Sequence, residues 1–142
     1  MAVMTLTGCT QSDQDKVEAL DRYVALERES LAVFLAQNPG IYREATVEGE
    51  LRHFDGEIFV EGSHAYVEFT YFYANALDWP SVEQELDGQT DTLDQVCRES
   101  VFPAMRANGV EGHLGVAWTY INGNNSGRWD YFCHSDGALA EE

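Results

Sequence analysis

The chain has 142 residues, the length of a single domain, and 44% of them are hydrophobic, enough to fill a core. Eight Lys and Arg residues stand against 25 Asp and Glu residues, so the formal net charge is −17. Nucleic acid and anionic lipid would repel such a protein, and we expect neither as a partner. No apolar run reaches the roughly 18 to 20 residues of a spanning helix, so any membrane attachment would come through a lipid.

The segment Leu6-Thr7-Gly8-Cys9 has the pattern that bacterial lipoprotein processing recognises. Processing acylates the cysteine and cuts the chain before it, and each buried methylene then contributes about 0.8 kcal/mol to membrane anchoring. The polar residues 10–15 suit a tether. We predict that residues 1–15 are the remnant of a lipoprotein signal plus a tether, and that lipidated Cys9 anchors an extracytoplasmic protein to the cell membrane. The alternative is a chance match in an ordinary N-terminus.

Residues 13–37 have the pattern of an amphipathic helix. Ser12 can cap its N-terminus, and Asp13 and Asp15 place negative charge in its first turn, where it is favourable. Asn38-Pro39-Gly40 is a strong stop signal. The apolar stripe recurs at helical spacing and consists of Val17, Leu20, Val24, Leu31 and Phe34.

Residues 41–73 are predicted to form two or three antiparallel strands, divided by turn signals at Asp55-Gly56 and Glu61-Gly62-Ser63. The clearest strand runs from Ala65 to Tyr73, because its side chains separate into two regular faces. One face carries Val67, Phe69, Tyr71 and Tyr73, and the other carries Tyr66, Glu68, Thr70 and Phe72.

A second helical segment is predicted from Pro80 to Asn108-Gly109. Pro103 removes one backbone donor and should kink or divide it. A hairpin follows, with strands at 114–120 and 129–133 on either side of a turn at 122–127. The helical stripe consists of Val82, Leu86, Leu93, Cys97, Val101 and Ala104, and one face of the last strand carries Trp129, Tyr131 and Cys133.

Cys97 and Cys133 remain as an even pair if Cys9 is lipidated, and in an oxidising compartment we expect them to form a disulfide. Closing a loop of this length stabilises a protein by roughly 3 to 4 kcal/mol in the chain-entropy model. The alternatives are two buried free thiols, or Cys133 and His134 as half of a nucleophile and base pair. Adjacent strand residues point to opposite faces, so that pair cannot work alone.

These elements predict an α+β fold in which two helices pack on one face of an antiparallel sheet of about four to five strands, in the order α-β-β-(β)-α-β-β. Residues 16–136 would form the single domain, and residues 137–142 an acidic tail. In this arrangement Cys97 and Cys133 can meet, since the helix stripe and the aromatic face of the last strand lie against each other.

The order of these elements, together with residues 102–110 and 116–123, resembles an uncharacterised domain family of small lipoproteins from Gram-positive bacteria. The resemblance covers about residues 17–135. The last hairpin of that family carries a tyrosine, an asparagine, an acidic residue and a turn glycine. Tyr120, Asn122 and Gly123 match, whereas no acidic residue lies inside the turn here. The resemblance implies this fold and an envelope location, and it implies no activity because the family's function is not established.

The sequence contains no glycine-rich phosphate loop, Gly-x-Ser-x-Gly elbow, His-Glu-x-x-His or Cys-x-x-Cys. A carboxylate pair such as Glu57 and Glu68 could serve glycoside hydrolysis, but with 25 acids some proximity is expected by chance. Residues 122–130 offer oxygen ligands that suit calcium, but they lack the alternating carboxylates of an EF-hand, and a hairpin turn would also use their asparagines and glycines. We predict no catalytic residue, no metal and no cofactor, and the histidines are read as solvated residues at strand ends and turns: His53, His64, His113 and His134.

The sheet face away from the helices is the remaining candidate for function, because in a two-layer fold it is open to solvent or to a partner. We expect a non-catalytic binding module at the cell envelope, with a protein, peptide or glycan as its partner. The alternative is a cell-envelope hydrolase that uses carboxylates with His113 or His134. The candidate binding residues are Tyr66, Thr70, Phe72, Asp130 and Phe132.

Overall fold

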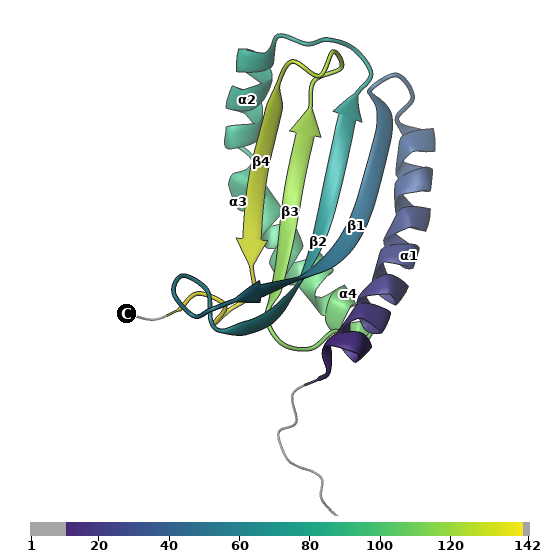
Figure 1. Cartoon of the computed structure of the whole chain (residues 1–142). Helices are drawn as coiled ribbons and strands as arrows, with labels where there is room; N and C mark the ends of the chain where they lie inside the picture. Colours follow the sequence, from purple (N-terminus) through teal and green to yellow (C-terminus); the bar gives the residue numbers. More distant parts are fainter. Residues whose placement is uncertain (1–10, 141–142) are drawn as a thin grey trace, which may run out of the picture.

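A computed structural model describes residues 11–140, so Cys9 and its predicted lipidation lie outside the described residues. The fold is α+β, with a mixed four-stranded sheet and helices on one of its faces (Figure 1). In chain order the elements are α1 (Asp13–Gln37), β1 (Tyr42–Phe54), β2 (Gly62–Tyr73), α2 (Trp79–Asp87), α3 (Thr90–Val96), the π-helical turn η2 (Cys97–Val101), α4 (Phe102–Ala107), β3 (Leu114–Ile121) and β4 (Arg128–His134). Within the described residues, no helix is long and apolar enough to cross a membrane.

Helix α1 has the predicted bounds, and its N-terminus is capped as expected by Ser12, whose hydroxyl accepts from the amide of Asp15 at 3.1 Å. The prediction for Val17 is wrong, since this side chain is 41% exposed. Lys16 takes its place with 3% exposure, because its ammonium reaches the carbonyl of Ser63 at 3.0 Å while its apolar stem packs inward. The buried stripe continues through Ala19, Leu20, Tyr23, Val24 and Leu31.

The sheet has the order β1-β2-β3-β4, and the prediction that it is wholly antiparallel is wrong. Strand β2 pairs with β3 in parallel, whereas the β1–β2 and β3–β4 pairs are antiparallel. The helical segment between β2 and β3 returns along the length of the sheet, so β3 starts at the same end as β2 (Figure 1). Such a crossover is what a parallel pair requires.

The second helical segment, which we predicted to be kinked or divided at Pro103, is divided before that residue. It breaks after Asp87 at Gly88, which is a poor helix former, and it widens into η2 just before Pro103. In η2 the amide of Phe102 donates to the carbonyl of Cys97, five residues earlier. This turn accommodates Pro103, which has no N–H and whose ring would clash within a regular helix.

The core lies between the helices and one sheet face, and the predicted disulfide joins its two layers. Cys97 and Cys133 are bonded, with their Cα atoms 6.5 Å apart, and both are almost fully buried. The indole of Trp118 donates to Cys97 Sγ at 3.4 Å, while its ring stacks on Phe69 with centroids 4.7 Å apart. The disulfide therefore fastens the irregular helical segment to β4.

Residues beyond both predicted domain boundaries make hydrogen bonds with the domain. Gln11 donates to the carbonyl of Gly109 at 2.7 Å and accepts from the amide of Glu111, so this residue of the predicted tether contacts the domain. At the other end, Ala140 donates to the carbonyl of Ile58 at 2.8 Å, which pairs part of the predicted tail with the β1–β2 connection. We call these two paired segments, residues 55–61 and 135–140, the cover.

Candidate ligand-binding surface on the open sheet face

The five candidate residues named from the sequence do lie on one sheet face, the face without helices. The strand register makes them neighbours across the sheet. Thr70 of β2 pairs with Thr119 of β3, which pairs with Asp130 of β4. Glu68, two residues before Thr70, is linked in the same way through Ala117 to Phe132. They differ in accessibility: Phe132 is 47% exposed, whereas Tyr66 is only 1% exposed. Tyr66 therefore cannot be the exposed contact that the sequence pattern indicates.

Tyr66 is buried because its ring lies over the neighbouring strand. A Cβ atom at Gly115 would lie 2.7 Å from Tyr66 Cζ, so only glycine leaves room for the ring. The hydroxyl forms a hydrogen bond with His134 Nε2 at 2.8 Å, and the guanidinium of Arg52 lies 4.2 Å from the ring centroid. Tyr66 thus links β2 to β4 across β3, and its ring forms the floor of a pocket.

An apolar pocket of about 240 Å³ opens above this floor. We call it the aromatic pocket, and it is lined by Arg52, Phe54, Phe59, Tyr66, Phe132 and His134. Phe59 comes from the first segment of the cover, residues 55–61, which lies beside the C-terminal segment of the cover at the end of the sheet (Figure 1). The cover is held by the amide of Val60, which donates to the carbonyl of Ala138 at 2.8 Å. The signal that sequence analysis missed is the apolar run Ile58-Phe59-Val60 between the two turn signals.

Arg52 lines the aromatic pocket, and the carboxylates that surround it outnumber it; we call these carboxylates the acidic rim. The guanidinium of Arg52 donates to Glu50 at 2.9 Å and to Glu68 at 3.1 Å, so two carboxylates face one cation. The hydrogen bond from Arg52 lowers the pKa of Glu50, whereas burial and the neighbouring Glu50 raise the pKa of Glu68. This surface therefore suits a ligand that brings positive charge.

Asp130 extends the acidic rim along β4. It accepts hydrogen bonds from Thr119 Oγ1 at 2.7 Å and from Arg128 Nε at 2.9 Å. Burial raises the pKa of Asp130, but the hydrogen bonds from Arg128 and Thr119 outweigh it and leave the pKa below the ordinary value. The carboxylate is consequently ionised and fixed in direction.

A cluster of histidines lies beneath the cover. His64 is fully buried, its Nε2 lies 2.7 Å from the carbonyl of Val60, and its Nδ1 has no hydrogen-bond partner in the part of the chain that the structure describes. The ring centroid of His113 is 4.9 Å away. Among residues 11–140 no group of three or more His, Cys, Asp or Glu side chains could hold a metal ion. The reading of His64 as a solvated residue is therefore wrong, and its role is to support the cover.

The histidine cluster predicts lower stability in mild acid. Burial lowers the pKa of His64 and of His134 below the ordinary value, with smaller contributions from Lys16 and Arg52 respectively. The unfolded chain then binds more protons than the folded one, so stability is complete above about pH 6.5 and falls as the pH drops toward the folded-state pKa values. Urea denaturation at pH 7.5 and 5.5 should show a smaller free energy of unfolding at the lower pH.

The control is His64→Gln, which keeps a donor for Val60 but does not titrate. Its stability should change less between the two pH values than that of the unmodified protein. An equal pH dependence in both would contradict a role for His64, because the acidic residues common to both proteins would then account for it.

A second aromatic cluster lies on the helix side of the sheet at its opposite end, and sequence analysis did not identify it as a unit. The rings of Tyr71 and Tyr120 stack with centroids 4.9 Å apart, and those of Tyr42 and Tyr73 are 5.2 Å apart. Burial raises the pKa of Tyr73 to about 12, and it raises the pKa of Tyr71 and Tyr120 as well. Phe34 of α1 packs on Tyr71, so this cluster belongs to the core.

The carboxylates considered for hydrolysis have other roles in the structure. The carboxylate that shares Arg52 with Glu68 is Glu50, and Glu57 lies exposed in the cover. His134 has its hydrogen bond with Tyr66. The hydrolase alternative therefore stays a prediction with no specific observation in its favour.

The loop considered for calcium binding uses its amide groups to hold the turn. Asn122 Oδ1 accepts from the amides of Leu77 and Gly123, each at 2.8 Å, and Asn124 Oδ1 accepts from the amide of Ser126 at 3.0 Å. These side-chain oxygens already serve the backbone of the turn and of its neighbour, which accounts for the asparagines in this segment.

No family model matches the chain, and no curated protein or solved structure matches it. The resemblance to small Gram-positive lipoproteins stays a prediction that rests on the residues quoted for it.

Proposed function

We propose that the protein is a non-catalytic binding module of the cell envelope and that the open sheet face is its working surface. The observation that carries this proposal is the aromatic pocket with its acidic rim. Phe132 is a large apolar side chain left 47% exposed beside a pocket lined mainly by rings. Isolated exposed apolar residues are common, but one at the mouth of an apolar pocket marks a binding site.

The partner that this surface fits is a polypeptide segment with an apolar side chain between positive charges. A pocket of about 240 Å³ is the size for one side chain rather than for a large cofactor. Glu50, Glu68 and Asp130 would attract Lys or Arg residues on either side of it, and the net charge of −17 would steer cationic segments toward the protein.

We place this module outside the cytoplasm. The Cys97–Cys133 disulfide supports that location, because structural disulfides persist mainly in oxidising compartments. The anchor is proposed from the Leu6–Cys9 motif alone, and mass analysis of protein from its native host would detect the acyl chains on Cys9.

The binding proposal is tested with a short synthetic peptide, Lys-Lys-Phe-Lys-Lys, and amide chemical-shift mapping by NMR. We expect shifts at the aromatic pocket and a loss of affinity of roughly tenfold for Phe132→Ser, since burying an apolar ring contributes on the order of 1.5 to 3 kcal/mol. Phe132 is suitable because its exposure lets the variant fold, whereas Tyr66 is part of the structure.

Two controls separate the expected contact from general attraction to an acidic protein. Val33→Ser removes a similarly exposed apolar residue on α1, at 55% exposure, and should leave the affinity unchanged. The peptide Lys-Lys-Ser-Lys-Lys keeps the charge and should bind more weakly. Equal binding by Phe132→Ser, or shifts confined to other surfaces, would refute the proposed site.

A further inference from the structure

The outer edge of β1 has no neighbouring strand among residues 11–140. β1 is 13 residues long, and its other edge pairs with β2. Arg28 Nε donates to the carbonyl of Val47 at 3.2 Å from α1, so the backbone of Val47 faces outward. Because backbone groups alternate in direction along a strand, Ala45, Gly49 and Leu51 also present their N–H and C=O groups to this edge.

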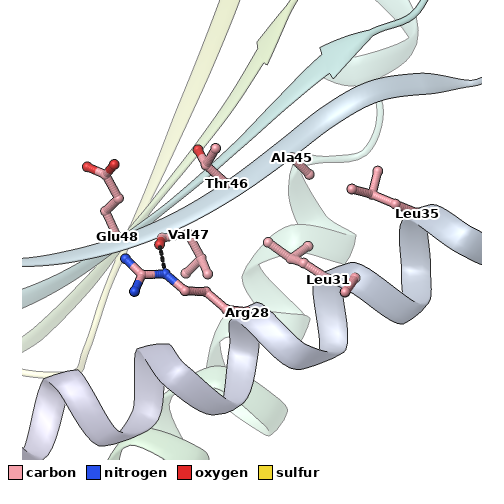
Figure 2. A pocket seen from close by; sticks show the side chains of 8 residues that line it. Arg28, Leu31, Leu35, Ala45, Thr46, Val47 and Glu48 are labelled. Atoms are coloured by element: carbon pink, nitrogen blue, oxygen red, sulfur yellow. Dashed lines mark hydrogen bonds between the residues drawn. The ribbon is translucent and has the colours of Figure 1, made fainter.

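A groove runs beside these groups between α1 and β1. It has a volume of about 340 Å³, and its lining is formed by Arg28, Leu31, Ala32, Leu35, Ala45, Thr46, Val47 and Glu48. Figure 2 shows Leu31 and Leu35 extending from α1 toward β1, with Arg28 reaching across to Val47. The alanines at positions 32 and 45 have short side chains, which helps to leave the groove open. An apolar groove thus lies directly along an unpaired strand edge.

The two faces of β1 differ in the polarity and charge of their side chains. Residues with odd numbers, such as Ala45 and Val47, face α1, whereas Glu44, Glu48 and Glu50 lie on the opposite face of the strand. A strand added at this edge would place alternate side chains against Leu31 and Leu35 and the others beside the glutamates. The complementary segment alternates apolar and cationic residues.

A second copy of this chain does not meet that requirement. Pairing two β1 edges would bring the glutamates of both copies onto one sheet face, where like charges oppose each other. Two proteins of net charge −17 also repel at long range. The acidic charge of the protein therefore favours a basic partner over self-association.

We propose that the β1 edge binds an extended cationic polypeptide segment by strand addition, with its apolar side chains in the groove between α1 and β1. Arg28 occupies the place of the incoming strand, because its Nε already donates to the Val47 carbonyl that a peptide N–H would use. Binding requires Arg28 to move aside. This site is separate from the aromatic pocket, and the inference does not depend on the function proposed above.

The test uses a capped heptapeptide of alternating valine and lysine, titrated into the full chain by calorimetry. A second peptide carries N-methyl groups on the alternate amides that would pair with β1, and a third, with the opposite set of amides methylated, is its matched control. We expect the second peptide to bind roughly tenfold or more weakly than the first, because methylation removes the ladder hydrogen bonds. The third should retain its affinity.

Arg28→Met keeps the apolar stem and removes the competing donor and the like charge, so it should strengthen binding several-fold. Phe132→Ser should leave binding unchanged, which distinguishes this site from the aromatic pocket. The proposal would be overturned by equal binding of both methylated peptides, by no binding of the unmethylated peptide, or by sedimentation evidence that a second copy already occupies the edge.

Discussion

Reduction of the Cys97–Cys133 disulfide should lower the free energy of unfolding by roughly 3 to 4 kcal/mol, as the chain-entropy model gives for a loop of this length. The two cysteines are 36 positions apart, so the bond removes many conformations from the unfolded chain. A second reason is local: the helical segment that carries Cys97 is broken at Gly88 and widened at η2, and the bond fastens it to β4. Urea denaturation with and without reductant measures the difference.

The control is the double variant Cys97→Ser and Cys133→Ala, in which the serine hydroxyl replaces the acceptor for the Trp118 indole. Its unfolding midpoint should match that of the reduced protein and should not respond to reductant. If the reduced and oxidised proteins unfolded at the same urea concentration, the bond would have no stabilising role.

Replacement of Asn122 by leucine should cost roughly 1 to 3 kcal/mol, because it removes two hydrogen bonds to Leu77 and each contributes about 0.5 to 1.5 kcal/mol. Asn122 is 2% exposed, and both polar atoms of its side chain contact Leu77. Oδ1 accepts from the Leu77 amide at 2.8 Å, and Nδ2 donates to the Leu77 carbonyl at 3.2 Å. One side chain thus joins the β3–β4 turn to the connection between β2 and α2.

Asn124→Leu is the matched control, since it makes the same change two residues away at an exposed position. It should cost less than about 1 kcal/mol, because water can replace its hydrogen bond to Ser126. Asn122→Asp keeps the acceptor, loses the donor and buries a charge, so we expect it to be destabilised too and to lose further stability as the pH rises through the carboxyl pKa. Similar stabilities for Asn122→Leu and Asn124→Leu would contradict the role assigned to Asn122.

Local sequence patterns predicted the elements that depend on neighbours along the chain. The bounds of α1 follow from the Ser12 cap and the Asn38-Pro39-Gly40 stop. The β3–β4 hairpin follows from alternation on either side of a polar turn. The disulfide followed from two independent patterns, because the helical stripe placed Cys97 inward and the strand alternation placed Cys133 on the aromatic face.

The same patterns could not predict the parallel pairing of β2 and β3. Alternation assigns the two faces of a strand but not its direction or its neighbour. The direction of β3 depends on the length and path of the helical segment before it, and that path changes at Gly88 and again before Pro103. Pairing direction is a property of the whole connection, so it appears only in the tertiary structure.

In the candidate site, too, the sequence predicted some features and only the tertiary structure showed the others. Period-two alternation correctly placed Tyr66 and Phe132 on one face, but it could not indicate that Tyr66 would be covered by Arg52 and accommodated by Gly115. The burial of His64 likewise results from the cover, whose two segments are far apart in the sequence.

The sequence by itself determined the helix and strand segments, the inward face of most of them, the cysteine pair and the acidic charge. The tertiary structure decided the mixed sheet, the aromatic pocket and the groove beside β1. The physical reason is range: capping, periodicity and turn preferences act between residues a few positions apart, whereas pockets and edges arise where distant segments exclude water from one another.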